Sequence, residues 1–163
     1  MVKIEETDKA YVAGLFDGEG CITLCRRNRP KGNWNDLRSI ALYLTNTDKA
    51  VVEFCQNLFG LGKVYKRKIP VGRGWKTPYQ WSVGSALDVE TVLELLIPYL
   101  KIKQAKAESA LKMVRLIQRQ DIERRKRLTA FATGLGFYTE TEVKERHRIA
   151  EEFLAIQSQR QCI

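Results

Sequence analysis

The sequence predicts an α+β domain in which two pairs of β-strands alternate with helices, in the order α-ββ-α-ββ-α, followed by further helices. Two pairs of segments show the two-residue apolar alternation of half-buried strands, and the segments between them show helical spacing. The 163 residues, 44% of them apolar, suffice for one hydrophobic core. Because no Pro-, Gly- or Ser-rich linker divides the chain, we expect one domain with one sheet.

The first helix is expected over residues 7–17, with Thr7 or Asp8 as its N-cap. An acidic, glycine-rich turn ends it. The first strand pair follows, over residues 22–27 and 39–44. In both strands aliphatic side chains alternate with hydroxyl, thiol, aromatic or basic ones, so one face of each strand should be buried.

The second helix is predicted to begin at the cap-forming residues 45–48. Its apolar positions fall on one face, and two glycines end it; these residues are Val51, Cys55, Leu58, Phe59, Gly60 and Gly62. A second strand pair is expected around residues 63–69 and 79–83. In its second strand Tyr79 and Trp81 alternate with polar residues, which indicates that both aromatic rings belong to the core.

Residues 85–88 resemble a capping box before a third helix that stops at Pro98. Its core positions are predicted to be Val89, Leu93 and Leu96. A long helix is expected from about 102 to 125, and residues 139–142 should cap a last helix. We expect a single domain over residues 1–163.

The charge balance indicates a polyanionic partner, since 28 Lys and Arg against 19 Asp and Glu give a net charge of +9. No apolar run reaches the ~18 residues of a membrane span, and the N-terminus does not resemble a signal peptide. We expect an intracellular protein with no membrane partner. A single histidine, His147, and four scattered cysteines exclude histidine-ligated zinc and Ser-His or Cys-His triads.

The most specific segment is residues 12–20, VAGLFDGEG, at the end of the first helix. Ala10, Gly14 and Gly18 lie four residues apart, so one helix face is almost bare and another backbone can approach it. Asp17 and Glu19 lie at the helix C-terminus, where the helix dipole disfavours each negative charge by ~0.3–1 kcal/mol. Such acidic oxygens suit Mg²⁺. An exposed turn with two acids of no function explains the residues equally well.

Residues 12–20 resemble the signature of the LAGLIDADG homing endonucleases, from which they depart at Val12, at residues 15–16 and at Glu19. Three further segments, 45–48, 60–62 and 98–103, resemble the family at the expected spacings. The resemblance covers about residues 8–118, which implies a core of that extent and a C-terminal helical extension of about 119–163. It implies the family's fold, with an antiparallel sheet that forms a DNA-binding saddle, and site-specific, Mg²⁺-dependent, staggered cleavage of both strands of DNA.

The chain carries one copy of the signature, because residues 132–136 repeat its small residues without its acids. Single-motif members of the family are homodimers. The resemblance therefore implies that two first helices pack together at a two-fold axis, with Ala10, Gly14 and Asp17 in the interface. Such a dimer reads a long, roughly palindromic site in double-stranded DNA.

By resemblance, Glu19 binds the metal together with the backbone carbonyl of Gly18, whereas Asp17 is a structural acid that holds helix ends together. Asn46 matches a polar position that orients water, although helix capping explains it equally well. Lys103 matches a lysine near the scissile phosphate, and Lys101 lies beside it. The alternative for Lys103 is a solvated lysine at a helix start.

The resemblance also assigns sequence reading to the polar face of the strands and to the segments next to them. Its residues are Thr23, Cys25, Arg27, Arg29, Ser39, Tyr43, Tyr65, Arg67, Gln80 and Ser82. The segment 63–76 has six cations and no acid, which is typical of a hairpin that follows phosphates. Thr139 is a candidate for a backbone phosphate contact.

The leading hypothesis is a homodimeric homing endonuclease encoded by an intron. The alternative is a non-cleaving binder of the same fold, either a maturase that assists splicing of intron RNA or a DNA-binding regulator. A basic structural protein of nucleoprotein particles is a third class, but it would not need Asp17 and Glu19 in this arrangement. The expected location is an organelle, chloroplast or mitochondrion, or the bacterial cytoplasm.

Overall fold

A computed structural model of the chain describes residues 4–27, 37–68, 74, 76–130 and 138–158. It contains an antiparallel four-stranded sheet, in the order β1-β2-β4-β3. The strands are β1 (Gly20–Arg27), β2 (Leu37–Asn46), β3 (Lys63–Lys66) and β4 (Tyr79–Val83). The helices are α1 (Glu6–Glu19), α2 (Lys49–Phe59), α3 (Ala86–Leu96), the short 3₁₀ turn η1 (Ile97–Tyr99), α4 (Gln104–Ala130) and α5 (Glu140–Ser158). The α+β class and the element order are as the sequence predicts.

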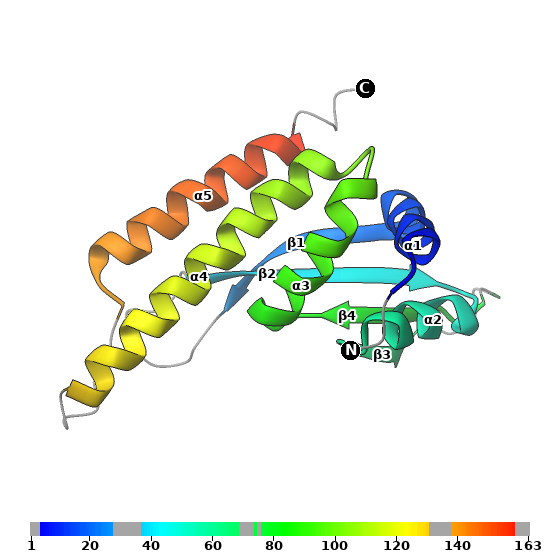
Figure 1. Ribbon diagram of the computed structural model, residues 1–163, viewed down its shortest axis with the longest axis horizontal. Helices are drawn as coiled ribbons and strands as arrows, with labels where there is room; N and C mark the ends of the chain where they lie inside the picture. Colours follow the sequence, from blue (N-terminus) through cyan, green and yellow to red (C-terminus); the bar gives the residue numbers. More distant parts are fainter. Residues whose placement is uncertain (1–3, 28–36, 69–73, 75, 131–137, 159–163) are drawn as a thin grey trace.

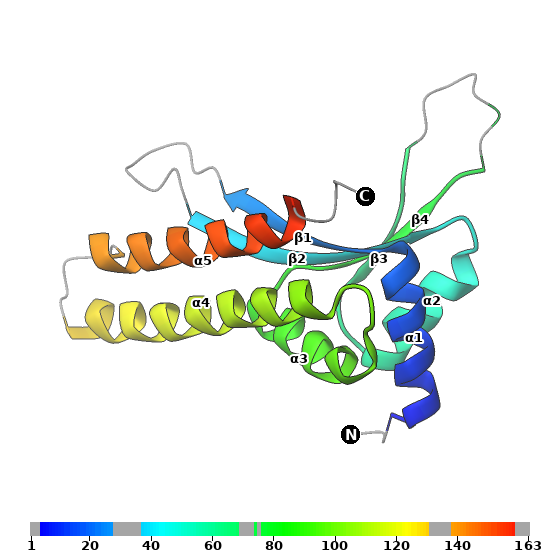
Figure 2. The same ribbon diagram turned by 90° about the horizontal axis from the view of Figure 1, so that it is seen from above.

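The hydrophobic core lies between one face of the sheet and the helices (Figures 1 and 2). The strands contribute alternate residues to it, which are Ile22, Ile40, Leu42, Leu44, Trp81 and Val83. Residues from α1 to α5 complete the same cluster, among them Phe16, Val52, Leu93, Met113 and Phe153. The described helices therefore pack on a single face of the sheet. The opposite face carries the polar half of the alternation.

The turn between α2 and β3 depends on two glycines and one buried aromatic ring. Gly60 (φ 64°) and Gly62 (φ 75°) both adopt the left-handed backbone conformation. Trp81 is fully buried, donates from Nε1 to the carbonyl of Leu61 at 2.8 Å, and stacks on Phe59 with the ring centroids 5.6 Å apart. The prediction that Trp81 belongs to the core is confirmed, and Tyr79 packs half-buried against that core.

Polar contacts join α4 and α5 over the buried Arg146, which is 3% exposed. Its Nε donates to Gln120, and its guanidinium lies 4.3 Å from the ring centroid of Tyr138. At the start of α5, residues 139–142 cap the helix as predicted: Thr139 and Glu142 form a capping box, in which each accepts the other's backbone N–H, at 3.2 and 2.6 Å. No described helix has the length and apolarity needed to cross a bilayer.

Several local expectations are wrong. The residue before α1 is Glu5, and no side chain caps that helix, so neither Thr7 nor Asp8 does so. Ser85 is the N-cap of α3 but makes no side-chain cap bond. In α2, Val52 is buried and Val51 is only partly buried, whereas Val51 was expected on the apolar face. The N-cap is Asp48, one of the predicted capping residues 45–48, and the helix begins at Lys49.

Two boundaries also differ from the expected ones. Strand β3 ends at Lys66, short of the expected residue 69; just beyond it, the Arg67 N–H donates to the Pro78 carbonyl at 2.9 Å. Helix α4 runs from Gln104 to Ala130, whereas the expected range was about 102–125. Three sequence features lie outside the described residues: the loop containing Arg29, the segment 132–136 that repeats the small residues of the signature, and Cys162.

The two glycines allow a test of the α2–β3 turn. Alanine at Gly60 meets nothing within 4 Å, so Gly60→Ala should lower the free energy of unfolding by only the ~1–2 kcal/mol of a left-handed backbone. At Gly62 the added Cβ would lie 2.5 Å from the Ser82 carbonyl oxygen, and the clash should add a further ~1–3 kcal/mol. Urea unfolding of the two variants measures the difference, and equal losses would contradict this description of the turn.

Candidate active site and nucleic-acid interface

The site is built around the C-terminus of α1, where Asp17 joins this helix to the segment before α4. Asp17 is 9% exposed, and its carboxylate accepts the backbone N–H groups of Lys101, Ile102 and Lys103 at 2.7, 3.0 and 2.8 Å. These N–H groups lie just before α4, where the backbone of the turn offers them no carbonyl acceptor, so the Asp17 carboxylate satisfies them. Both carboxylate oxygens of Asp17 therefore accept hydrogen bonds from the same chain, which is typical of a structural acid.

The environment of Asp17 favours its ionised form. Burial alone would raise the pKa of this carboxyl, but the three backbone N–H donors and the charge of Lys103 together exceed that effect and lower the pKa below its ordinary value. Asp17 is therefore ionised at neutral pH.

Lys103 completes the junction in the opposite direction. Its ammonium donates to the carbonyl oxygens of Phe16, at 3.1 Å, and of Asp17. The last turn of α1 contains no basic residue of its own. The Lys103 ammonium therefore adds a charged donor at the end of α1 and offsets the negative end of the helix dipole. The lysine lies beside the acidic turn and has a structural role there.

Glu19 points out of this junction. It is exposed, and its Oε2 accepts a hydrogen bond of 2.6 Å from Nδ2 of Asn46. The amide oxygen of Asn46 accepts the backbone N–H of Asp48 at 2.8 Å, and Asp48 in turn caps α2 by accepting the Ala50 N–H at 2.9 Å. Asn46 thus fixes the Glu19 carboxylate to the start of α2, and the helix-capping role falls to Asp48.

A shallow hollow of about 270 Å³ opens beside Glu19 and Asn46. Its other lining residues, Thr45, Thr47 and Pro78, are not among the predicted site residues. The two threonines alternate with Asn46 at the end of β2, so strand periodicity could have indicated them. Within the described part of the chain, no three His, Cys, Asp or Glu side chains lie close enough to share a metal ion. An exposed carboxylate among hydroxyl, amide and carbonyl oxygens suits a hard cation such as Mg²⁺.

The open face of the sheet brings most of the predicted reading residues together, because directly paired residues share a face. Cys21, Tyr43, Ser82 and Lys63 form one row across the four strands, and Thr45, Gln80 and Tyr65 form a second. Thr23 pairs with Ala41, and Cys25 with Ser39. Cys21 and Thr45 were missed, although the alternation that selects Thr23 and Tyr43 also places them on this face. Lys63 was predicted as one of the phosphate-following cations and not as a reading residue.

Contacts between these side chains order the open face. The Gln80 amide donates to the Thr45 hydroxyl at 3.2 Å, and the Cys25 sulfur lies 3.8 Å from the Tyr43 hydroxyl. Burial and, after it, the Cys25 contact raise the pKa of Tyr43, so its hydroxyl stays protonated and able to donate. The face offers hydroxyl, amide and thiol groups at strand spacing, which suits recognition of base edges.

The remaining predicted residues take no part in these contacts. Arg67 is exposed just beyond β3, and Arg27 ends β1 opposite Leu37. Lys101 is exposed beside the α1 junction. Thr139 uses its hydroxyl in the capping box of α5. On α1, Gly14 and Gly18 are exposed, and a Cβ at either would meet nothing within 4 Å.

Comparison with known proteins agrees with this arrangement. The sequence model described as LAGLIDADG endonuclease matches residues 12–100, from the middle of α1 through the sheet to the segment before α4. The chain belongs to the LAGLIDADG endonuclease family. The matched segment contains Glu19 and Asn46 and ends just before Lys101.

Individual relatives are more distant. The chain is 26% identical over 108 residues to the DNA endonuclease I-CvuI of Chlorella vulgaris, a match that covers 65% of this chain and 63% of that protein. The crystal structure of I-CvuI with an uncleaved DNA target in the presence of Mg has a TM-score of 0.61 at 21% identity, covering 91% of this chain and 95% of the other. The DNA complex of the archaeal intron-encoded homing endonuclease I-Vdi141I has a TM-score of 0.69 at 11% identity, covering 92% and 84%. These likenesses confirm the LAGLIDADG fold.

Replacing Asp17 tests the junction. Asp17→Asn leaves one acceptor oxygen for three N–H donors and places an NH₂ group among them, so we expect a loss of ~1–3 kcal/mol in the free energy of unfolding at pH 7. Because the folded-state pKa of Asp17 is lowered, its ionised form stabilises the fold above the unfolded pKa of ~3.9 and loses this contribution as the pH falls through the folded pKa. Urea unfolding at pH 7 and pH 3 should show that the difference in free energy of unfolding between the wild type and Asp17→Asn is smaller at pH 3 than at pH 7. An equal difference at the two pH values would contradict the role of the Asp17 charge.

Proposed function

We propose that the protein is a site-specific DNA endonuclease that acts as a homodimer and makes metal-dependent, staggered cuts in both strands of a long, roughly palindromic target. The observation that carries the proposal is the exposed Glu19 carboxylate, which Asn46 holds at the end of α1, beside a polar sheet face. I-CvuI, the curated relative, is named as a DNA endonuclease. A regulator or maturase with no cleavage would not need an acid fixed in this place.

Two copies of the chain complete the site. One chain brings a single acid, Glu19, to the hollow. Packing α1 against α1 of a second copy, along the exposed face of Gly14 and Gly18, would bring a second Glu19 close to the first. The open faces of the two sheets would then form one continuous DNA-binding saddle.

Glu19 and the backbone carbonyl of Gly18 would hold Mg²⁺. When bound, the ion would lower the pKa of the attacking water and compensate the negative charge of the phosphate oxygens. Asn46 fixes the carboxylate through its amide, and Lys103 contributes positive charge at the adjacent carbonyl groups. Asp17 acts through position, since it holds residues 101–103 against the turn that carries Glu19.

The first experiment separates cleavage from binding. Glu19→Gln keeps the shape of the side chain and an oxygen for Asn46, and it removes the charge that holds the metal. We expect cleavage of a cognate site, selected from a DNA library in Mg²⁺, to fall by roughly 100-fold or more while DNA binding persists. Glu108→Gln, an exposed substitution of the same kind on α4, should cleave normally. Tight binding by the wild type with no cleavage in any divalent metal would overturn the nuclease proposal.

The second experiment addresses the dimer. Because a side chain at Gly14 meets nothing in its own chain and leucine is a better helix former than glycine, Gly14→Leu should keep or raise the stability of the single chain by up to ~1 kcal/mol. It should block close packing of two α1 helices. We expect sedimentation to give a wild-type dimer and a folded monomeric variant with far-ultraviolet circular dichroism unchanged. A wild-type monomer, both free and on DNA, would refute the dimer.

A further inference from the structure

A chain of three hydrogen bonds links Glu19 to the first turn of α2. Asn46 joins Glu19 to Asp48, since its Nδ2 donates to Oε2 of Glu19 at 2.6 Å and its Oδ1 accepts the backbone N–H of Asp48 at 2.8 Å. The Asp48 carboxylate in turn accepts the Ala50 N–H at 2.9 Å and so caps the helix. The side chain of Asp48 is therefore connected to the candidate metal ligand through one amide.

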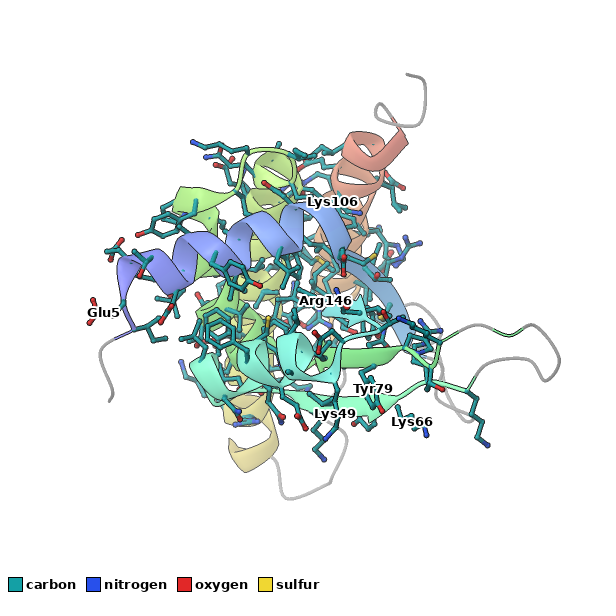
Figure 3. All side chains as sticks on the ribbon, turned by 90° about the vertical axis from the view of Figure 1, so that its right-hand side faces the viewer. Glu5, Lys49, Lys66, Tyr79, Lys106 and Arg146 are labelled. Carbon is teal, nitrogen blue, oxygen red and sulfur yellow. The ribbon has the colours of Figure 1, made fainter. Side chains whose placement is uncertain are left out.

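The sheet fixes the backbone of Asn46. This residue ends β2 and pairs with Tyr79 of β4. Figure 3 shows Tyr79 near Lys49, the first residue of α2, so the end of the strand and the start of the helix meet at this corner of the molecule. The amide of Asn46 can still turn about its own side-chain bonds. A further contact has to set which end of the amide faces Glu19.

The backbone N–H of Asp48 sets that orientation. The Asn46 amide has a donor end and an acceptor end of nearly the same shape. As it lies, each end meets a complementary group, the carboxylate of Glu19 and the N–H of Asp48. In the reversed orientation the NH₂ group would meet the N–H and the amide oxygen would meet the carboxylate, so both hydrogen bonds would be replaced by repulsions. Only one orientation can hold the Glu19 carboxylate.

The place of this N–H depends on the cap of α2. The bond from the Asn46 side chain to the N–H two residues on is an Asx turn. The first turn of α2 contains no acid, and Asp48 supplies the carboxylate that satisfies one of its N–H groups and compensates the positive end of the helix dipole. The turn and the cap share residue 48, so loosening the cap loosens the turn that orients the amide.

We propose that Asp48 is a positioning residue for the metal site: by capping α2 it keeps the Asn46 amide in the orientation that fixes the Glu19 carboxylate. This inference rests on the proposed function, in which Glu19 binds the metal. Asp48 acts through Asn46 and is not itself a ligand. A carboxylate that is fixed before the cation arrives loses less conformational freedom on binding, so Asp48 strengthens metal binding from outside the site.

The test compares the Mg²⁺ concentration for half-maximal DNA cleavage among variants. Asp48→Ala removes the capping oxygen, and we expect it to raise this concentration by roughly 10-fold, as loss of an outer partner of a metal ligand does. Asp48→Asn keeps an oxygen for the cap and removes the charge, so it should behave as the wild type. Asn46→Ala should also raise the concentration, and adding Asp48→Ala to it should have no further effect, because Asp48 acts through Asn46.

A control at the other end of α2 separates positioning from stability. Gly60→Ala strains the C-cap of the helix, outside the contacts of Glu19, so it should keep the wild-type Mg²⁺ requirement. Asp48→Gly provides a second variant, because glycine at an N-cap costs little stability, and it should match Asp48→Ala. An unchanged requirement in both Asp48→Ala and Asp48→Gly would overturn the positioning role. An equal rise in Gly60→Ala or in Asp48→Asn would overturn it as well.

A second measurement needs neither metal nor cleavage. In the free protein, the NMR signals of the Asn46 side-chain NH₂ group report its hydrogen bond through their positions and their rate of exchange with water. We expect Asp48→Ala to shift these signals and speed the exchange, and Asp48→Asn to leave both close to wild type. Unchanged signals in Asp48→Ala would overturn the role of Asp48. A wild type that shows the expected signals but never cleaves DNA would instead overturn the endonuclease proposal and leave the orienting of Asn46 by Asp48 standing.

Discussion

The reciprocal junction between α1 and the segment before α4 is the constraint on which the candidate site depends. The Asp17 carboxylate satisfies three N–H groups of residues 101–103, and the Lys103 ammonium returns positive charge to the carbonyl groups at the end of α1. Two segments more than 80 residues apart are thereby fixed to each other within hydrogen-bonding distance. Glu19 lies two residues beyond this junction, so its position follows from the junction and from Asn46.

The sheet separates stability from recognition by alternation along its strands. Ile22, Leu42 and Trp81 enter the core with the helices, while their neighbours in sequence form polar rows across the open face. Antiparallel register makes these rows continuous over four strands. Substitutions in the rows can therefore change what the face binds without creating cavities in the core.

Periodicity in the sequence predicts the element order and the two faces of the sheet, because both depend on local apolar spacing. Periodicity does not predict the features that depend on tertiary contacts. The three bonds of Asp17 to residues 101–103 connect distant segments, and no local pattern indicates them. Likewise Ser85 resembles a capping residue but makes no cap bond, and β3 is shorter than its sequence suggests. For the site, the glycine spacing and two acids identified α1, but its contacts with Asn46 and Lys103 required the fold.

The lysines of β3 have a consequence for assembly. An outer strand with unpaired backbone groups can recruit a strand from another molecule and so lead to aggregation. Strand β3 has only four residues, and lysines stand at both of its ends, Lys63 and Lys66. Sheet-to-sheet addition at this border would bring the ammonium groups of two copies together. The two lysines therefore protect this border from uncontrolled strand addition.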